Sequence, residues 1–266
     1  MIDDGDGQRS TPNGWLTVDI HSQFMVSLII PTLNEAELLP HTLARVRANN
    51  APHEILVVDG GSSDCTVTLA EAGGARVIHS PQCQRAFQMN LGAQYARGEA
   101  FLFLHADTWI GPNALSQIED VLRDARVVGG GFARRFRSRS PILRVTCMIS
   151  RWRSRWFGWF YGDQGIFVRR AIFERVGGFR NLSLFEDVDF SREIARHGRV
   201  VTLRADVISS GRRFAGRGAL AATASDLWLT LRYFAGAHPA RLASERGQGK
   251  SHGRARPPKH GRAVGP

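Results

Sequence analysis

The chain has 266 residues, of which 43% are hydrophobic, so it is long enough to bury a large core and short for two full domains, and we expect one main domain with appendages. Its net charge of +11 is concentrated in two segments, because eight arginines between Arg134 and Arg155 contribute +8 and residues 244–266 contribute +5. The remaining residues carry −2, which argues against a nucleic-acid groove through the fold and favours local contacts with acidic or membrane partners.

Strands and helices alternate regularly along the first half of the chain. Apolar β-branched runs predict strands that are buried on both faces, and Gly and Pro residues mark where the intervening helices begin and end. The predicted strands cover residues 26–30, 55–58, 76–79 and 100–104, and the predicted helices cover residues 35–49, 64–72, 84–97 and the segment that begins at Pro112. This alternation predicts a Rossmann-like α/β domain with a mostly parallel central sheet, helices on both faces, and ligands beyond the carboxyl ends of the strands.

The pattern loosens after Asp124, where three consecutive glycines, the arginine-rich segment and a tryptophan-rich stretch follow one another. We expect a domain over residues 25–243, preceded by a disordered lead (1–24) and followed by a disordered basic tail (244–266) without apolar periodicity. The lead is acidic and polar, unlike a signal peptide, and no window of about eighteen residues is apolar enough to span a membrane. Three cysteines without a CxxC pair predict free thiols in a reducing compartment.

Polar residues follow the first two predicted strands, in the segments 31–35 (PTLNE) and 59–64 (DGGSSD). Asp59 ends an apolar strand and precedes two glycines, so the backbone can approach a ligand while the carboxylate accepts hydrogen bonds from a base or ribose. The alternative is a turn aspartate, and Asp64 fits a helix cap. The position of Asp59 beyond a buried strand favours a ligand contact.

A third polar cluster, His105-Ala106-Asp107, ends the fourth predicted strand. Strand alternation would point the His105 and Asp107 side chains in the same direction. A carboxylate and an imidazole suit Mn²⁺ or Mg²⁺ held between the protein and two phosphates, and Asp107 is the stronger candidate. His105 could equally be a hydrogen-bonded histidine without a metal contact.

Five segments between Val26 and Arg217 resemble, in their order, the family-2 inverting glycosyltransferases of the GT-A type. They are SLIIPTLNEAELL, ILVVDGGSSDCT, RAFQMNLGAQYARGEAFLFLHAD, GDQGIFVRRAIFERVGGF and FEDVDFSREIARHG. Five ordered motifs are more specific than any one of them. The resemblance implies a GT-A fold that transfers a hexosyl-type sugar from a nucleotide-diphosphate donor to a hydroxyl acceptor, with inversion and a divalent metal (Mn²⁺ or Mg²⁺). Residues 25–125 would then form the nucleotide-sugar-binding half and residues 126–243 the acceptor half.

The resemblance also implies roles for single residues on the donor side. Pro31, Asn34 and Glu35 would flank the nucleotide, Asp59 would bind its base, and Arg85 would approach the phosphates. The family's Asp-X-Asp metal motif appears here as His105-Ala106-Asp107, so its first carboxylate is missing. This departure leaves Asp107 and His105 as the candidate ligands of the expected metal.

On the acceptor side, Glu186-Asp187 resembles the family's Glu-Asp pair, whose second carboxylate acts as general base on the acceptor hydroxyl. An inverting transfer needs one such base, and we assign this role to Asp187. Glu186 and Asp187 would also stabilise the positive end of a helix, and the two roles are compatible. Asp163-Gln164 resembles the family's acceptor-side loop.

Arg212-Arg213-Phe214 lies where many members carry an Arg-Trp element that closes over diphosphate, with phenylalanine in place of the tryptophan. Arg212 or Arg213 could contact phosphate oxygens, and a solvated basic pair is the alternative.

Tryptophans and arginines interleave over residues 151–160. Aromatic rings beside cations favour a membrane interface or a lipid-linked acceptor, and core packing is the alternative for the aromatic side chains. The free thiols expected in a reducing compartment agree with a cytoplasmic enzyme, and the interleaved segment adds peripheral contact at the inner face of the membrane as a further expectation. The partners expected are the nucleotide-sugar donor and a hydroxyl acceptor, and not nucleic acid.

Two other functions compete with sugar transfer. The first is a nucleic-acid or anionic-lipid binding protein that uses the basic segments on an α/β scaffold, and the −2 charge of the body speaks against it. The second is a nucleotidyltransferase, which would need a glycine-rich phosphate loop with a lysine near the first strand. Lysine is nearly absent from the chain.

Overall fold

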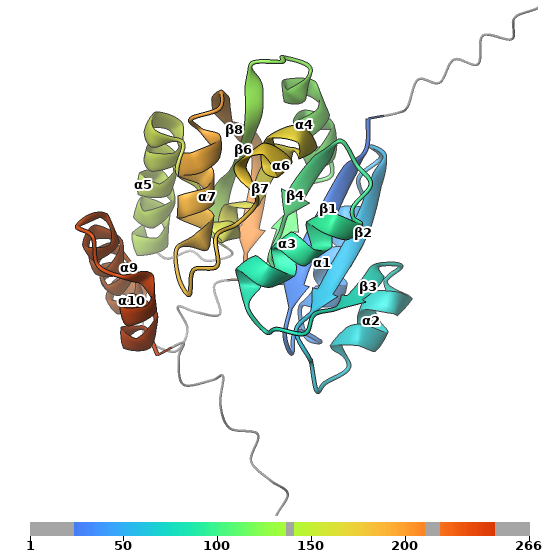
Figure 1. Cartoon of the computed structure of the whole chain (residues 1–266), viewed down its shortest axis with the longest axis horizontal. Coiled ribbons are helices and arrows are strands. Elements are labelled where there is room, and N and C mark those ends of the chain that lie inside the picture. Colours follow the sequence, from blue (N-terminus) through green and yellow to red (C-terminus); the bar gives the residue numbers. More distant parts are fainter. Residues whose placement is uncertain (1–23, 137–140, 211–218, 248–266) are drawn as a thin grey trace, which may run out of the picture.

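An eight-stranded mixed sheet forms the centre of the molecule in the computed structural model, which describes residues 24–136, 141–210 and 219–247 (Figure 1). The strand order across the sheet is β3-β2-β1-β4-β7-β6-β8-β5. The strands are β1 Val26–Thr32, β2 His53–Asp59, β3 Arg76–His79, β4 Ala100–Phe103, β5 Thr108–Ile110, β6 Val127–Phe136, β7 Ile166–Arg169 and β8 Arg199–Ser209. Apart from Phe24, the predicted lead lies outside the described residues, as do Arg212 and Arg213.

The first half of the chain forms a parallel block. Strand β1 pairs in parallel with both β2 and β4, and β2 pairs in parallel with β3. Successive residues of β1 face different hydrophobic cores, because Leu28 and Ile30 pack into one core and Ile29 packs into the other. Such two-sided burial is the reason that parallel strands are continuously apolar. The predicted mostly parallel α/β sheet is thus confirmed.

Helices cover both faces of this sheet, as expected. On one face lie α1 (Leu39–Arg47), α2 (Thr66–Ala72) and α4 (Ala114–Leu122), whose apolar residues belong to one core. On the other face lie α3 (Arg85–Tyr95), α6 (Arg170–Val176) and α7 (Glu186–Ile194). Pro40 lies in the first turn of α1, where it costs no backbone hydrogen bond.

The second half is more regular than its sequence suggests, because the three glycines after Asp124 lie inside the ten-residue strand β6. A Cβ on Gly130 would overlap the carbonyl oxygen of Val201 in β8, and a Cβ on Gly131 would overlap the ring of Phe160. Glycine is therefore required by the close approach of neighbouring chain segments. Strand β6 runs antiparallel to β7 and parallel to β8, so the sheet becomes mixed here.

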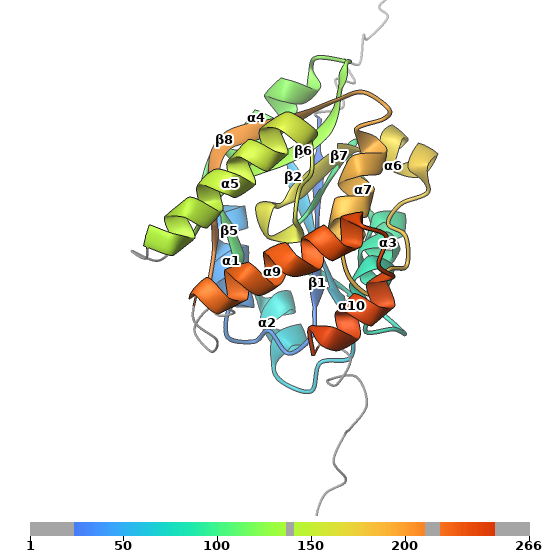
Figure 2. The same cartoon turned by 90° about the vertical axis from the view of Figure 1, so that its left-hand side faces the viewer.

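Three further helices lie outside the two main layers. They are α5 (Pro141–Phe157), α9 (Ala219–Phe234) and α10 (Pro239–Glu245), and Figure 2 shows α5 and α9 side by side on one face of the molecule. Helix α10 ends at Glu245, so the first two residues of the predicted tail are helical, and the tail beyond Gly247 lies outside the described residues. None of the described helices combines the length and the apolar character that crossing a bilayer requires.

Candidate active site

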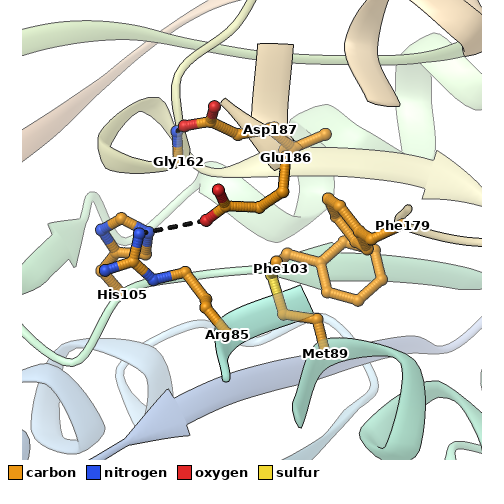
Figure 3. A pocket seen from close by; sticks show the side chains of 9 residues that line it. Arg85, Met89, Phe103, His105, Gly162, Phe179, Glu186 and Asp187 are labelled. Atoms are coloured by element: carbon orange, nitrogen blue, oxygen red, sulfur yellow. Dashed lines mark hydrogen bonds and ion pairs between the residues drawn. The ribbon is translucent and has the colours of Figure 1, made fainter. Parts of the chain in front are cut away.

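A small pocket lies where the loop after β4, the start of α3 and the start of α7 meet (Figure 3). Polar and charged side chains from three of the predicted segments line it together with Gly162 and four apolar residues. The lining residues are Arg85, Met89, Phe103, His105, Gly162, Ile166, Phe179, Glu186 and Asp187. The structure thus brings together Arg85, His105, Glu186 and Asp187, which are separated by up to about a hundred residues in sequence.

Asp187 is held at the start of α7 by two backbone groups. Gly162 N donates to Asp187 Oδ2 at 2.6 Å, and Val188 N donates to Asp187 Oδ1 at 2.7 Å. Burial and the adjacent charge of Glu186 raise the pKa of Asp187 to about 7, even though these two hydrogen bonds favour the ionised form. A carboxyl group with a pKa near neutrality can take up a proton from a bound hydroxyl.

Arg85 and Glu186 form an ion pair beside this carboxylate, with 3.1 Å between Arg85 Nη1 and Glu186 Oε1 (Figure 3). Glu186 is buried, and it lies in the first turn of α7. Although partial burial disfavours the charge of Arg85, whose side chain is 47% exposed, the carboxylates of Glu186 and Asp187 hold its pKa above the usual value. The pocket therefore keeps a permanent positive charge.

His105 lies against Gly162 and close to Arg85. Burial and the charge of Arg85 lower the pKa of His105 to about 4, so the imidazole is neutral at pH 7. A Cβ on Gly162 would overlap His105 Nε2, which explains why glycine precedes Asp163 here. Gly162 thus contacts two residues of the pocket. Its N–H donates to Asp187, and its lack of a Cβ leaves room for the imidazole ring of His105.

The His105-Ala106-Asp107 segment differs from its expected geometry. Strand β4 ends at Phe103, and residues 106–107 form a turn before β5, so strand alternation does not orient the two side chains. His105 lines the pocket, whereas Asp107 accepts a hydrogen bond from Ser210 Oγ at 2.9 Å and is not part of the lining. Ala106 is buried in the core, and its carbonyl accepts a hydrogen bond from Thr42.

The described residues contain no group of three or more His, Cys, Asp or Glu side chains that converge on one point. Asp107 offers one carboxylate, and His105 offers a neutral imidazole nitrogen. This donor set fits a cation that takes most of its ligands from phosphate oxygens and water, as Mg²⁺ does at nucleotides. It does not fit a cation enclosed by protein ligands alone.

The two donor-side loops start at the same edge of the sheet, because Thr32 and Asp59 are register partners at the ends of β1 and β2. Asp59 is 1% exposed. Its carboxylate accepts hydrogen bonds from Gly61 N (2.9 Å) and Ser62 N (2.8 Å) of its own turn and from Thr32 Oγ1 (3.2 Å). These contacts are those of a turn aspartate, the alternative considered above, and binding of a base by Asp59 stays a prediction.

The first of these loops is fixed by the second. Asn34 adopts a positive φ of 54°, and its Oδ1 accepts a hydrogen bond from Ser63 N at 2.8 Å. Glu35 N donates to Thr66 Oγ1 at 2.8 Å, and Pro31 lies within β1 opposite Val58. The segment that was expected to flank a nucleotide is thus held in one conformation, although none of its residues lines the pocket.

Two arginines that the sequence did not single out, buried Arg134 and partly buried Arg153, support the Gly162–Gln164 turn (η1). Arg134 forms an ion pair with Asp163, and Arg153 Nη2 donates to Gln164 Oε1 at 2.7 Å. Gln164 is fully buried and also donates to the carbonyl of Phe132 at 3.2 Å. Asp163 and Gln164, expected on the acceptor side, therefore hold the turn that presents Gly162 to Asp187.

A comparison with known families explains this arrangement. Residues 27–182 match the profile described as glycosyl transferase family 2. The chain belongs to glycosyl transferase family 2. It is therefore a glycosyltransferase, and the alternative of an α/β scaffold that carries basic binding segments is not favoured.

Relatives and solved structures agree with this assignment. The chain is 31% identical over 196 residues to a PGL/p-HBAD biosynthesis glycosyltransferase of Mycobacterium bovis, and the alignment covers 67% of this chain and 72% of that protein. The same identity and coverage hold for a protein of that name from Mycobacterium tuberculosis. This family-2 chain is also 42% identical over 57 residues, or 21% of its length, to an uncharacterized glycosyltransferase of Mycobacterium bovis.

Among solved structures, the chain resembles the mannosyltransferase PcManGT from Pyrobaculum calidifontis in complex with GDP-Man and Mn²⁺. The TM-score is 0.63 at 22% identity, over 82% of this chain and 67% of that chain. It also resembles S. aureus TarS 1–349 in complex with UDP-GlcNAc, with a TM-score of 0.58 at 17% identity, over 74% of this chain and 61% of that chain. At these identities the likeness establishes the GT-A fold, which confirms the expected fold class.

Proposed function

We propose that this glycosyltransferase moves a sugar from a nucleotide-diphosphate donor to a hydroxyl acceptor with inversion at the anomeric carbon. The observation that carries the proposal is the environment of Asp187. Its carboxylate lies in a pocket at the start of a helix, is oriented by two backbone N–H groups, and has a pKa of about 7. These are the properties of a general base that works near neutral pH.

In the proposed reaction, Asp187 accepts the proton of the acceptor hydroxyl while the acceptor oxygen forms a bond to the anomeric carbon. The bond from that carbon to the diphosphate oxygen breaks, and its electron pair leaves with the nucleoside diphosphate. A single base on the acceptor side suffices for this displacement. Because the acceptor oxygen attacks from the side opposite the departing diphosphate, the configuration at the anomeric carbon is inverted. Gly162 N and Val188 N keep the carboxylate aimed during the transfer.

Glu186 and Arg85 shift the pKa of Asp187 in opposite directions, because the charge of Glu186 raises this pKa and the charge of Arg85 lowers it. Arg85 keeps its positive charge within the pocket and can therefore contact the diphosphate, in line with the role expected from the family resemblance. The loop residues Pro31, Asn34, Glu35 and Asp59 are proposed to contact the nucleotide, and Asp163 and Gln164 to support the acceptor side.

A divalent metal is part of the proposal. His105 and Asp107 would hold it, and bound there it would neutralise negative charge on the departing diphosphate. The neutral imidazole of His105 suits this role, because only the unprotonated nitrogen can coordinate a cation. Arg212 and Arg213, proposed to contact the diphosphate, lie outside the described residues.

The proposal is tested by screening nucleotide sugars and simple hydroxyl acceptors for release of nucleoside diphosphate. We expect release to depend on Mn²⁺ or Mg²⁺ and to fall to background when EDTA is added, with activity restored by excess metal. Retaining stereochemistry in the product, determined by NMR, would contradict the single-base mechanism. Full activity in EDTA would contradict the metal part alone.

Substitution of Gly162 by alanine tests the geometry of the pocket. The added Cβ would overlap His105 Nε2, so the ring or the turn must move. We expect Gly162→Ala to lower turnover about 100-fold, because a displacement on the order of 1 Å suffices for such a loss. When His105 is already replaced by alanine, Gly162→Ala should lower turnover little further, because the imidazole that the new Cβ would overlap is absent. Additive losses would show that Gly162 acts through Asp187 alone.

The predicted lipid-linked acceptor and the peripheral position at a membrane are proposals of a separate kind. They rest on the outer surface of α5 and α9 and not on the pocket.

A further inference from the structure

Exposed apolar side chains are concentrated on two helices. The described residues include twelve exposed large hydrophobic side chains, of which ten lie on α5 and α9. Those on α5 are Val145, Met148, Ile149, Trp152, Trp156 and Phe157. Those on α9 are Leu227, Trp228, Leu231 and Phe234. Such a concentration marks an interaction surface, because scattered apolar residues would be spread over many elements. We call these ten residues the apolar face.

The spacing of these residues makes the apolar face continuous along α5. Val145, Ile149, Trp152 and Trp156 recur every three or four residues and therefore lie along one side of the helix. Trp156 is 70% exposed and Met148 is 66% exposed. The opposite side of α5 carries buried residues such as Leu143, Ser150 and Ser154. Helix α5 thus has one side in the protein and an apolar side without a partner among the described residues.

Aromatic contacts join the two helices into one surface. Trp152 meets Phe157 edge-on with 5.6 Å between ring centroids, and Phe157 stacks on Trp159 at 4.9 Å. Trp159 in turn stacks on Phe234 of α9 at 4.4 Å. The two helices run side by side across the same face of the molecule (Figure 2). The apolar face is therefore formed by both helices together.

Three arginines border the apolar face on α5. Arg144, Arg151 and Arg155 are exposed, and their spacing of seven and then four residues aligns them along one flank of the helix. Helix α5 contains no Asp or Glu in its 17 residues. No carboxylate of the described residues lies within ion-pair distance of these three arginines. Their charges are available to an anionic partner.

We infer that α5 and α9 lie flat on an anionic phospholipid bilayer, with the apolar face at the level of the acyl chains and the three arginines among the phosphates. Tryptophan and arginine beside aliphatic residues are the composition of helices that lie in the interface plane. A second copy of this chain fits the apolar face less well, because its own α5, which also lacks carboxylates, would place positive charges against those of the first. The helices do not need to span the membrane for this contact.

The inner side of α9 reaches the residues next to the pocket. Tyr161 Oη lies 2.8 Å from Thr230 Oγ1, and Tyr161 precedes Gly162. The ring of Tyr233 stacks on Phe185 at 4.8 Å, and Phe185 precedes Glu186. Membrane contact through α9 would therefore place the pocket near a membrane-borne acceptor. That last step rests on the proposed function, whereas the membrane contact itself does not.

The test uses the full chain without donor or metal, so its outcome is independent of the transferase proposal. Binding is measured by co-sedimentation with phosphatidylcholine vesicles and with vesicles that contain about a third phosphatidylglycerol. The first variant is Arg144→Gln/Arg151→Gln/Arg155→Gln. Its matched control is Arg45→Gln/Arg97→Gln/Arg175→Gln, which removes the same charge from exposed residues outside α5 and α9. The second variant is Trp152→Ser/Trp156→Ser, with Tyr95→Ser as the control for loss of an exposed aromatic ring.

We expect the parent chain to bind the anionic vesicles and the first variant to bind about 100-fold more weakly, because each arginine near an anionic surface contributes roughly fivefold. The Trp variant should also lose binding, while both controls stay within about threefold of the parent. Equal losses in the arginine variant and its control would overturn the inference, because they indicate a general charge effect. Absence of vesicle binding, with a dimer in sedimentation equilibrium that the Trp variant abolishes, would assign the apolar face to a second copy.

Discussion

Asp187→Asn is expected to lower the turnover of this glycosyltransferase by about 1000-fold, in the middle of the range of roughly 100- to 10,000-fold for loss of a general base. The asparagine keeps the size of the side chain and one acceptor for Gly162 N or Val188 N, but it cannot take up the proton. The measurement is release of nucleoside diphosphate under saturating donor and acceptor. Donor affinity, measured by calorimetry, should change little.

Asp189→Asn provides the matched control, because Asp189 lies in the same first turn of α7 but does not line the pocket. Its partly buried carboxylate pairs with the exposed Arg180 at 3.5 Å and accepts a hydrogen bond from Tyr233 Oη at 3.4 Å, which an asparagine oxygen can also accept. The loss of charge should change turnover less than about threefold, since an ion pair with an exposed partner contributes little. Similar losses in both variants would show that α7 needs its first-turn charges for structure, and would remove the role of Asp187 as base.

The same assignment fixes the pH dependence. Asp187 must be ionised to accept a proton, so kcat/KM should rise tenfold per pH unit below its pKa of about 7 and level off above it. Because this pKa is raised, the native state binds more protons than the unfolded chain between about pH 4 and pH 7. The carboxylate therefore lowers the free energy of unfolding progressively as the pH rises through that window. Thermal melts should show Asp187→Asn gaining stability relative to the parent from pH 5 to pH 8.

The second large effect concerns the free energy of unfolding. Asp163→Asn should lower it by about 3–5 kcal/mol at pH 7, because it leaves the buried charge of Arg134 without its carboxylate. Although burial opposes ionisation, Arg134 holds the pKa of Asp163 below its usual value. The carboxylate is thus ionised at pH 7, and its contribution is lost only as the pH falls through that lowered pKa. Urea denaturation measures the change.

The double variant Asp163→Asn/Arg134→Met distinguishes an ion pair from two separate contributions. Removing both charges should restore part of the stability lost in the single variants, because neither partner is left buried alone. The change for the double variant should then be at least about 2 kcal/mol smaller than the sum of the two single changes. Additive losses would show that Arg134 and Asp163 stabilise the fold independently.

The parallel half of the fold could be predicted because its signals are local. The apolar runs of β1 and β2 and the glycines after α2 are visible within a few residues, and a strand buried on both faces has little alternative. The position of Asp187 at the start of a helix came from the same kind of pattern. Its proposed role as base rests on the family resemblance, since periodicity cannot distinguish a helix cap from a base.

What could not be predicted depends on contacts that are distant in sequence. Glycines in a sequence, taken alone, suggest a loop. Gly130 nevertheless lies in a strand, at a position where the carbonyl oxygen of Val201 leaves no room for a Cβ. Arg134 and Arg153 were counted in the arginine-rich segment that was expected to contact acidic or membrane partners, but Asp163 and Gln164 of this chain are their partners. An arginine is buried only when its partner is present, and the partner of Arg134 follows 29 residues later. Only the polar Gly-Asp-Gln sequence between two hydrophobic stretches could have hinted at such a partner.

His105 and Asp107 illustrate a different limit. The expected alternation holds only within a strand, and β4 ends two residues before His105. A boundary shift of this size is common, yet it decides whether the two side chains face the same cation. The candidate metal ligands are therefore the part of the site that a sequence pattern constrains least.

The contacts of α9 have a consequence for how relatives of this enzyme can be recombined. The family match ends at residue 182, before both Asp187 and α9. Yet α9 touches Tyr161 on one side of the pocket and Phe185 on the other. A chimera that exchanged only the C-terminal helices would lose these two contacts, which adjoin Gly162 and Glu186. In such a chimera, helix α9 should therefore be exchanged together with the segments that contain Tyr161 and Phe185.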